Sequence, residues 1–165
     1  VYLQRGGSCT SNAVCGCDHY IYHRDSTTWD PSTIFAYYNQ KRKEKPMLDD
    51  GSNVEDALKI CKKYGVCSSK VWSNDNPFNK MPSKEAYKNG LKGKEIKKWY
   101  EVKNFKQIKQ ALVSGYPVAV AVAWCFKSID PITHIMNSPS DKEVKKCLEG
   151  HAVVIVGYDD DKKTT

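Results

Sequence analysis

The sequence predicts an α+β fold with a helical front lobe and a β-rich rear lobe that share a cleft. Two observations lead to this fold class. Apolar residues in the first half recur at helical spacing, whereas the second half contains two short Val- and Ala-rich runs typical of strands. The length of 165 residues leaves room for one compact domain or two half-sized lobes. We therefore expect a single domain, with residues 1–95 forming the helical lobe and residues 96–165 the β-rich lobe.

Three helices are expected in the front lobe, and each begins or ends at a residue that favours a helix terminus. They span residues 9–23, 33–43 and 54–64. Ser8 and Ser32 precede the first two helices, and a serine hydroxyl can accept a hydrogen bond from an unpaired backbone N–H of the first turn. Gly65 follows the third helix and marks its end. A polar loop at 68–81 and a short helix beginning near Ser83 complete this lobe.

The rear lobe changes from helical to strand-like patterning. The elements expected there are a strand at 96–102, a helix at 105–114, strands at 117–124 and 151–158, and a polar loop at 127–149 between the last two strands. The run at 117–124 is nearly continuous Val and Ala, which is typical of a strand buried on both faces. Asp159, Asp160 and Asp161 then indicate a charged hairpin turn and not a cation site.

Composition and charge exclude several classes of protein. Hydrophobic residues make up 40% of the chain, enough for a packed core, so general disorder is excluded. The longest strongly apolar run, Ala119 to Phe126, is far shorter than the roughly 20 residues that cross a bilayer, so no membrane partner is expected. The net charge is +7, but the 26 basic residues are spread along the chain as a solvated coat. Nucleic acid is therefore not an expected partner.

The cysteines point to chemistry. Their number is odd, so at least one thiol is unpaired. The seven are Cys9, Cys15, Cys17, Cys61, Cys67, Cys125 and Cys147. The spacing does not determine which of them pair, and Cys61 or Cys67 is a candidate for a disulfide with another cysteine.

Cys9 and His151 form the strongest candidate catalytic pair. Cys9 follows two glycines and a serine at the start of the first predicted helix, where unpaired N–H groups and the helix dipole stabilise a thiolate. His151 follows Gly150 and opens the last predicted strand, a rigid position from which an imidazole can face a cleft. Either residue alone could equally be structural, a buried cysteine or a core histidine. Together they fit a nucleophile and base that meet between lobes.

Two other histidine patterns compete with this pair. Cys15, His19 and His23 recur every four residues on one helix face and could present metal ligands. A straight helix rarely lets three such positions converge on one ion, so packing between lobes is the favoured interpretation and neither a metal nor another cofactor is expected. His134 is an alternative base, although its loop is a poor support for one.

Several motifs in the chain, taken in order, resemble the papain-like cysteine peptidases over nearly the whole length. They are Gln4, Gly6-Gly7-Ser8-Cys9-Thr10, Asp50-Gly51-Ser52, Tyr116-Pro117-Val118-Ala119-Val120, and the run from Gly150-His151 to Gly157-Tyr158. The residue after the cysteine, Thr10, is closer to the microbial or viral branch than to plant enzymes or cathepsins, which have Trp there. The resemblance implies a papain-like two-lobe fold with the active-site cleft between the lobes.

The resemblance also implies a role for each matching residue. Cys9 would attack a peptide carbonyl, with His151 as the base and acid that completes the reaction. The Cys9 backbone N–H and the Gln4 side chain would form the oxyanion hole. The residues implied in binding a peptide or protein substrate are Gly7, Ser8, Gly51, Ser52, Val118, Val120 and Gly150. Among these, Gly51 and Ser52 would pair with an extended substrate backbone.

The sequence departs from the family pattern in four respects. Gln4 lies five residues before Cys9, where the family has six. The asparagine that orients the histidine would follow the last strand, and Asn137-Ser138 is no substitute because it precedes His151. We therefore expect the chain to be C-terminally incomplete. The front-lobe disulfide of secreted members is absent, since Asp49 and Asp50 precede Gly51. An inhibitory propeptide, a possible partner, is not visible in this chain.

The expected function is thiol-dependent proteolysis, by an endopeptidase or an exopeptidase. Two alternatives stay open. One is an inactive papain-like protein that keeps the cleft for binding or packaging, and the other is acyl transfer or deamidation by the same cysteine and histidine. A secreted, lysosome-like or virion-associated location is expected more than the free cytosol.

Overall fold

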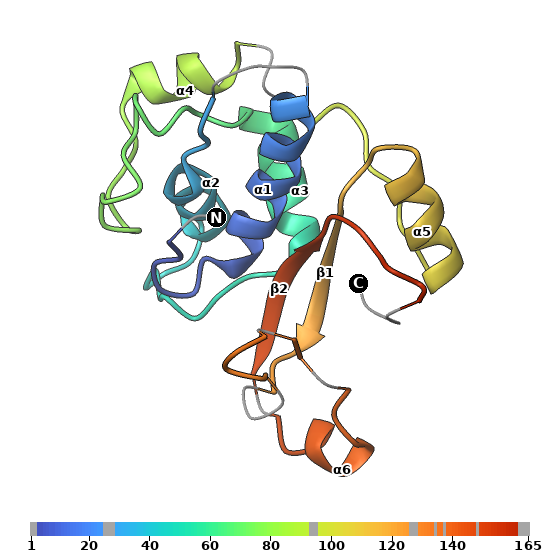
Figure 1. The fold of residues 1–165 in the computed structure, drawn as a ribbon. Coiled ribbons are helices and arrows are strands. Elements are labelled where there is room, and N and C mark those ends of the chain that lie inside the picture. Colours follow the sequence, from blue (N-terminus) through green and yellow to red (C-terminus); the bar gives the residue numbers. More distant parts are fainter. Residues whose placement is uncertain are drawn as a thin grey trace.

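The computed structural model has a mixed α/β fold and describes residues 3–24, 29–92, 96–125, 129–133, 135–136, 138–147 and 149–161 (Figure 1). In chain order the elements are α1 (Cys9–Arg24), α2 (Thr33–Lys41), α3 (Val54–Tyr64), α4 (Lys84–Gly90), α5 (Phe105–Val113), β1 (Val118–Ala123), α6 (Asp141–Val144) and β2 (Gly150–Ile155). In this part of the chain, no helix combines the length and the apolar character that a membrane span requires.

The helix termini lie at or close to the positions predicted from local signals. The Ser32 hydroxyl accepts a hydrogen bond from the Phe35 N–H and begins α2. α3 has the predicted bounds and ends at Gly65, whose φ is +67°. At α1 the Ser8 carbonyl accepts the first helical hydrogen bond, but its hydroxyl donates to the Arg5 carbonyl. Ser8 therefore stabilises the turn before the helix and does not cap the helix with its side chain.

The core of the protein lies among the first four helices. One cluster of buried residues joins α1, α2 and α3 and consists of Val14, Cys15, Ala36, Ala57, Cys61 and Val66. A second cluster joins α2 to α4 and consists of Phe35, Cys67, Trp72 and Ala86. Phe35 is fully buried and meets the ring of Tyr87 edge-on, with ring centroids 5.2 Å apart. α2 thus contributes to both clusters and is the central helix of the front half.

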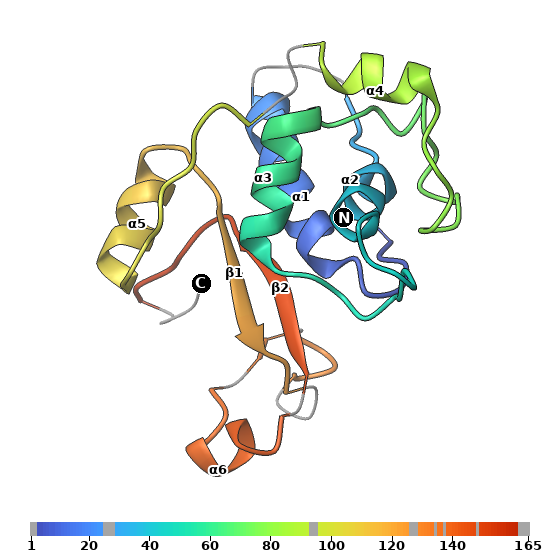
Figure 2. The same ribbon diagram turned by 180° about the vertical axis from the view of Figure 1, so that it is seen from behind.

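β1 and β2 form a two-stranded antiparallel sheet that packs against α1. Val118 pairs with Ile155 at one end, and Val122 pairs with His151 near the other. Figures 1 and 2 show α1 beside β2, while α5 lies beside β1 on the other side of the sheet. Few sheet residues are buried, with Val118 and Ala152 the most enclosed in the two strands. The sheet therefore contributes less to the core than the helices do.

The predicted strand at 96–102 is wrong. These residues have no regular secondary structure, and they connect α4 to α5. Their pattern is strand-like, but a strand persists only when a neighbouring strand takes its hydrogen bonds. Within the described residues β1 pairs only with β2, and Ile96 instead packs against the core cluster of α1, α2 and α3.

The two remaining strands are correct in position but not in burial or length. β1 is only partly buried along its length, so the prediction of a strand enclosed on both faces is wrong. A two-stranded sheet with α1 on one side leaves much of each strand accessible. β2 ends at Ile155, and Val156 is 55% exposed. The segment predicted as a loop at 127–149 contains α6, where Ser140 and Glu143 form a capping box.

The disulfide in the structure joins Cys125 and Cys147, across the segment between β1 and β2. Cys61 and Cys67, the sequence-based candidates, are both free and buried. Cys61 lies beside Cys15 in the first core cluster, and Cys67 packs with Phe35 in the second. The five remaining thiols are unpaired, which confirms the expectation of at least one.

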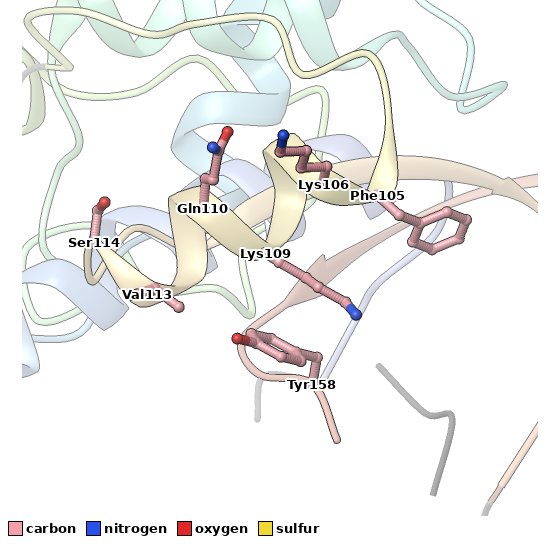
Figure 3. Close-up of a pocket in the computed structure, with 7 residues that line it drawn as sticks. All are labelled: Phe105, Lys106, Lys109, Gln110, Val113, Ser114 and Tyr158. Carbon is pink, nitrogen blue, oxygen red and sulfur yellow. The ribbon is translucent and has the colours of Figure 1, made fainter. Parts of the chain in front are cut away.

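A shallow groove crosses the exposed side of α5. Its lining residues come from the helix and from the segment after β2, and they are Phe105, Lys106, Lys109, Gln110, Val113, Ser114 and Tyr158. Figure 3 shows the Lys109 side chain extending toward the Tyr158 ring, with Nζ 5.1 Å from the ring centroid. Lys109 also forms an ion pair with Asp160 in the turn that follows. That turn is therefore an ion-paired surface feature, in agreement with the turn predicted there.

Candidate active site

Cys9 and His151 lie at the same end of two elements that pack together. α1 and β2 run in the same direction in Figure 1, and a Cβ placed on Gly16 would lie 3.4 Å from Val154 Cγ2. Cys9 precedes Gly16 by about 10 Å of helix, at roughly 1.5 Å per residue. His151 precedes Val154 by about 10 Å of strand, at roughly 3.3 Å per residue. Along the common direction of α1 and β2, Cys9 and His151 therefore lie about equally far before the contact between Gly16 and Val154.

The surroundings of each residue leave it accessible. Cys9 is a half-buried free thiol in the first turn of α1, where backbone N–H groups have no helical acceptor. The His151 ring lies against the Trp124 indole, with centroids 4.5 Å apart and planes at 55°. In the described part of the chain no hydrogen bond joins Cys9 to His151. The structure thus places the two residues at the same end of α1 and β2 without a direct bond.

Gln4 is exposed and forms a hydrogen bond within its own loop. Its Nε2 donates to the Gly6 carbonyl at 3.0 Å. An amide nitrogen carries two hydrogens, so one N–H is engaged and the other is free to donate. Gln4 is therefore on the loop that leads to Cys9, and its amide can still offer a donor.

A hydrogen-bond chain connects the loop before Cys9 to Gly51. Gly51 and Ser52, the two residues predicted to pair with a substrate backbone, are called the strip below. Asp49 Oδ1 accepts from the Gly7 N–H at 2.7 Å and from the Tyr37 hydroxyl at 2.8 Å. The Gly51 N–H then donates to Tyr37 Oη at 3.2 Å. A Cβ on Gly7 would lie 2.6 Å from the Gly51 nitrogen, so only glycine permits this approach. Gly7 and Gly51, both predicted to bind substrate, are brought together.

The Gly51 peptide is also held on its carbonyl side. Lys41 Nζ donates to the Gly51 carbonyl at 3.0 Å and forms an ion pair with Asp50 at 2.5 Å. The hydrogen bond from Lys41 lowers the pKa of the Asp50 carboxyl. Both polar groups of Gly51 are therefore engaged inside the protein. Ser52 is half-buried, and among the described residues its backbone groups make no hydrogen bond.

The other predicted binding residues differ in exposure. Ser8 is fully buried and Val118 is 7% exposed, whereas Gly150 is exposed with no atom within 4 Å of a Cβ placed on it. Val120 is half-buried and pairs with Val153. Val118 and Val120 are on β1, where the partner strand β2 also carries His151.

The row of possible metal ligands on α1 divides between two environments. Cys15 lies in the core, where its hydrogen bond with Cys61 and its burial raise the pKa of its thiol. His19 lies 3.7 Å from Asp30 and contacts His23, with ring centroids 4.8 Å apart. In the described segments no set of three or more such side chains is arranged to hold a metal ion. The alternative base His134 lies outside the described residues, as does Asn137.

A groove between α1 and β2 contains these two histidines. It is lined by Asn12, Ala13, Gly16, His19, Tyr20, His23, Ala152, Val153, Val154 and Val156. It follows the direction in which both elements extend away from Cys9 and His151. His19 and His23 line this groove with β2, as the predicted packing of this face against the second half requires, whereas Cys15 of the same face packs in the core of the first half.

Sequence reasoning missed the part that α2 plays in the site. Tyr37, Gln40 and Lys41 lie three and four residues apart, on one helix face, and all reach backbone near the site. Gln40 Nε2 bonds both Thr10 Oγ1 and the Asn53 carbonyl, at 3.3 Å each. The signal available in the sequence was a tyrosine, a glutamine and a lysine at helical spacing in the second half of the predicted helix.

Two thiols with raised pKa values, the half-buried Cys17 and the buried Cys67, make the stability of the protein sensitive to alkaline pH. Burial and the charge of Asp18 raise the pKa of Cys17 to about 12, and burial and the charge of Glu85 raise that of Cys67 to about 12. The folded state therefore keeps these protons at a pH where the unfolded chain releases them. The stabilisation is complete below about pH 9 and decreases from there toward pH 12, by about 1.4 kcal/mol per pH unit for each thiol.

We expect the free energy of unfolding to fall steeply between pH 9 and pH 11, as measured by denaturant titration at each pH. The Cys17→Ala variant should lose stability less steeply, by about 1.4 kcal/mol per pH unit. Equal slopes for the two proteins would show that the Cys17 thiol does not carry the effect.

Comparison with known proteins identifies the family. The Peptidase_C39 like family matches residues 32–165, a range that includes His151 but not Cys9. An uncharacterized peptidase C1-like protein, L477, of Acanthamoeba polyphaga mimivirus is 33% identical over 175 residues, covering 96% of this chain and 55% of that protein. The chain thus spans about half the length of this curated relative.

A solved structure is similar over most of the chain. The crystal structure of xylellain, a cysteine protease from Xylella fastidiosa, has a TM-score of 0.75 and 27% identity, covering 95% of this chain and 65% of that one. The sequence match to the family extends over most of the chain, and the two relatives agree with it in type. The chain therefore belongs to the Peptidase_C39 like family, and the two relatives carry the names of a peptidase C1-like protein and a cysteine protease.

Proposed function

We propose that this protein hydrolyses peptide bonds, with Cys9 as the nucleophile and His151 as the base and acid. The observation that carries the proposal is the position of both residues at the same end of α1 and β2, in a chain of the cysteine-peptidase type. A helix N-terminus favours the thiolate form of a cysteine, and a histidine at the start of a paired strand is held in place by the ladder.

The reaction proceeds in two steps. The Cys9 thiolate attacks the carbonyl carbon, and the resulting oxyanion is stabilised by the Cys9 backbone N–H and by the free N–H of the Gln4 amide. His151 gives its proton to the leaving amine as the thioester forms. Water then attacks the thioester, with His151 taking a proton from it, and the carboxylic acid and the free thiol are released.

The substrate backbone would pair with Ser52 and not with Gly51. The Gly51 N–H and carbonyl are engaged by Tyr37 and Lys41, whereas the Ser52 backbone groups are available. Pairing of an extended peptide with such groups is a common mode of recognition. Val118 and Val120 would border an apolar pocket, and the open surface at Gly150 would admit the substrate beside His151.

We further propose that the chain follows the papain-like arrangement. Residues 1–95 would supply the nucleophile side of the cleft and residues 96–165 the histidine side. This division is supported by the concentration of the buried core clusters in the first four helices and by the sheet that carries His151 in the second part.

One observation favours an alternative in which the cleft serves binding alone. The ring contact of His151 is with the Trp124 indole, and in the described residues no hydrogen bond orients its imidazole. A base in this chemistry is normally oriented by a third group. An inactive binding protein of the same fold is therefore the second candidate function.

Intact-mass analysis after exposure to a peptidyl epoxysuccinate near pH 6 separates the two functions. We expect a single adduct in the wild type and none in Cys9→Ala. An ordinary thiol, with a pKa of about 8.5, is almost wholly protonated at that pH. The Cys17→Ala variant is the matched control and should form the adduct normally, because burial raises the pKa of Cys17 to about 12. A wild type that forms no adduct would contradict the peptidase and favour the binding protein.

A further inference from the structure

The Asp49 carboxylate is the point at which three separate segments of the chain meet. It receives hydrogen bonds from the loop before Cys9 through Gly7 and from α2 through Tyr37, and the Gly7 and Asp49 positions are 42 residues apart. Tyr37 in turn receives the Gly51 N–H. The side chains of Asp49 and Tyr37 therefore determine the separation between the loop before Cys9 and the strip that would bind substrate.

The loop before Cys9 lies close to both side chains of this pair, of which Asp49 is exposed and Tyr37 is buried. A Cβ on Gly7 would lie 2.9 Å from Tyr37 Oη, and one on Gly6, where φ is +57°, would lie 1.9 Å from Asp49 Oδ2. The two glycines thus allow backbone and side chain to approach without an intervening group. The loop before Cys9 can move away from the strip only if the hydrogen bonds to Asp49 break.

Tyr37 is suited to hold this position. Its side chain is fully buried on α2, and its ring packs against Phe78 with centroids 5.8 Å apart. Burial and the hydrogen bond to Asp49 raise the pKa of the Tyr37 phenol, so it remains a donor under alkaline conditions as well. A rigid donor on a central helix positions the two loops more accurately than a flexible surface side chain could.

We propose that Tyr37 and Asp49 are positioning residues that hold the strip at Gly51 and Ser52 in register with Cys9, and that they thereby favour reaction with an extended peptide over reaction with a small molecule. The inference rests on the proposed function. A displacement of about 1 Å in a substrate-positioning element can cost on the order of 100-fold in rate. A small electrophile needs only the thiolate and is indifferent to the strip.

The test compares two electrophiles on the same thiol. Second-order rate constants for modification of Cys9 are measured with a peptidyl epoxysuccinate and with iodoacetamide, well below the melting temperature of each variant. In Tyr37→Phe, which removes only the hydroxyl, we expect the peptidyl rate to fall at least about tenfold and the iodoacetamide rate to change less than about twofold. Tyr38→Phe removes the same group from the adjacent residue and should match the wild type.

Asp49 provides the second variant pair. Asp49→Asn keeps an oxygen acceptor at this position, whereas Asp49→Ala removes it. We expect the asparagine variant to retain most of the peptidyl preference and the alanine variant to lose it. A merely structural role would lower the melting temperature and slow both electrophiles equally, and that result would overturn the proposal.

Amide hydrogen exchange adds a readout that does not depend on reactivity. The Gly7 and Gly51 amides should be protected in the wild type, and the Gly51 amide should exchange at least about tenfold faster in Tyr37→Phe. Unchanged exchange would overturn the proposal. Failure of the proposed function gives a different result, because a wild type that prefers the peptidyl reagent but cleaves no peptide would leave the positioning role standing. A wild type without that preference would overturn the positioning role itself.

Discussion

Replacing His151 with alanine is expected to lower kcat for a peptide substrate by about 10²–10⁴, the range that a positioned general acid and base contributes. The backbone of His151 is held opposite Val122 by the pairing of β2 with β1, and its imidazole contacts the Trp124 ring. KM should change much less than kcat, since proton transfer matters in the transition state and little in substrate binding. Steady-state kinetics with a fluorogenic peptide at neutral pH measures both quantities.

The matched control for this variant is His23→Ala. His23 is an exposed histidine on α1 whose ring contacts His19, and it lies toward the opposite end of the groove. Its replacement should leave kcat within about twofold of the wild type. Equal losses in the two variants, or full activity in His151→Ala, would assign the base to another group. Circular dichroism of both variants shows whether the fold is retained.

The Gly65→Ala variant should be the most destabilised of the single substitutions considered. Gly65 ends α3 with φ +67° and ψ −168°, a conformation that is essentially restricted to glycine and costs other residues about 1–3 kcal/mol. An added Cβ would also lie 1.8 Å from the Gly90 carbonyl oxygen at the end of α4. Because that atom is backbone, it cannot rotate away. We expect a total loss of at least about 3 kcal/mol, or about 6–12 °C in Tm.

Two further glycines test the cause of this loss. In Gly157→Ala nothing lies within 4 Å of the new Cβ, so its Tm should stay within about 2 °C of the wild type. In Gly90→Ala the new Cβ would lie 2.5 Å from the Tyr64 carbonyl, so this variant should also be destabilised. Differential scanning calorimetry of the three variants gives the comparison. Equal melting of Gly65→Ala and Gly157→Ala would show that α3 and α4 can separate at little cost.

The helices were largely predictable from the sequence because their ends depend on residues close in the chain. Gly65 was predicted to end α3 and does so, and the side chain of Asn53 accepts from the Asp56 N–H at the start of the same helix, so both ends of α3 depend on residues next to them. The motifs around Cys9 and His151 predicted a relationship to cysteine peptidases, and the family match and the names of the two relatives agree with this relationship. The roles of the two residues stay predictions.

The errors came from features that depend on distant partners. The segment at 96–102 has strand-like residues, but no other strand in the described chain pairs with it, so it is irregular. Burial of β1 was overestimated because a hydrophobic run does not indicate how many layers cover it. The disulfide between Cys125 and Cys147 was not predicted either, since pairing depends on the path of the chain between them.

The sequence by itself determined the ends of the helices in the first half and the relationship to cysteine peptidases, and it predicted the residues most suited to that chemistry. Only the tertiary structure decided which of those groups are free to act. Gly51 and Ser52 are neighbours with similar local signals, yet Gly51 is engaged on both sides by Tyr37 and Lys41 from α2. The physical reason is the distance along the chain between a group and the partner that decides its state. A helix end satisfies its hydrogen bonds within a few residues, whereas the engagement of a backbone group and the burial of a thiol are decided by elements far along the chain.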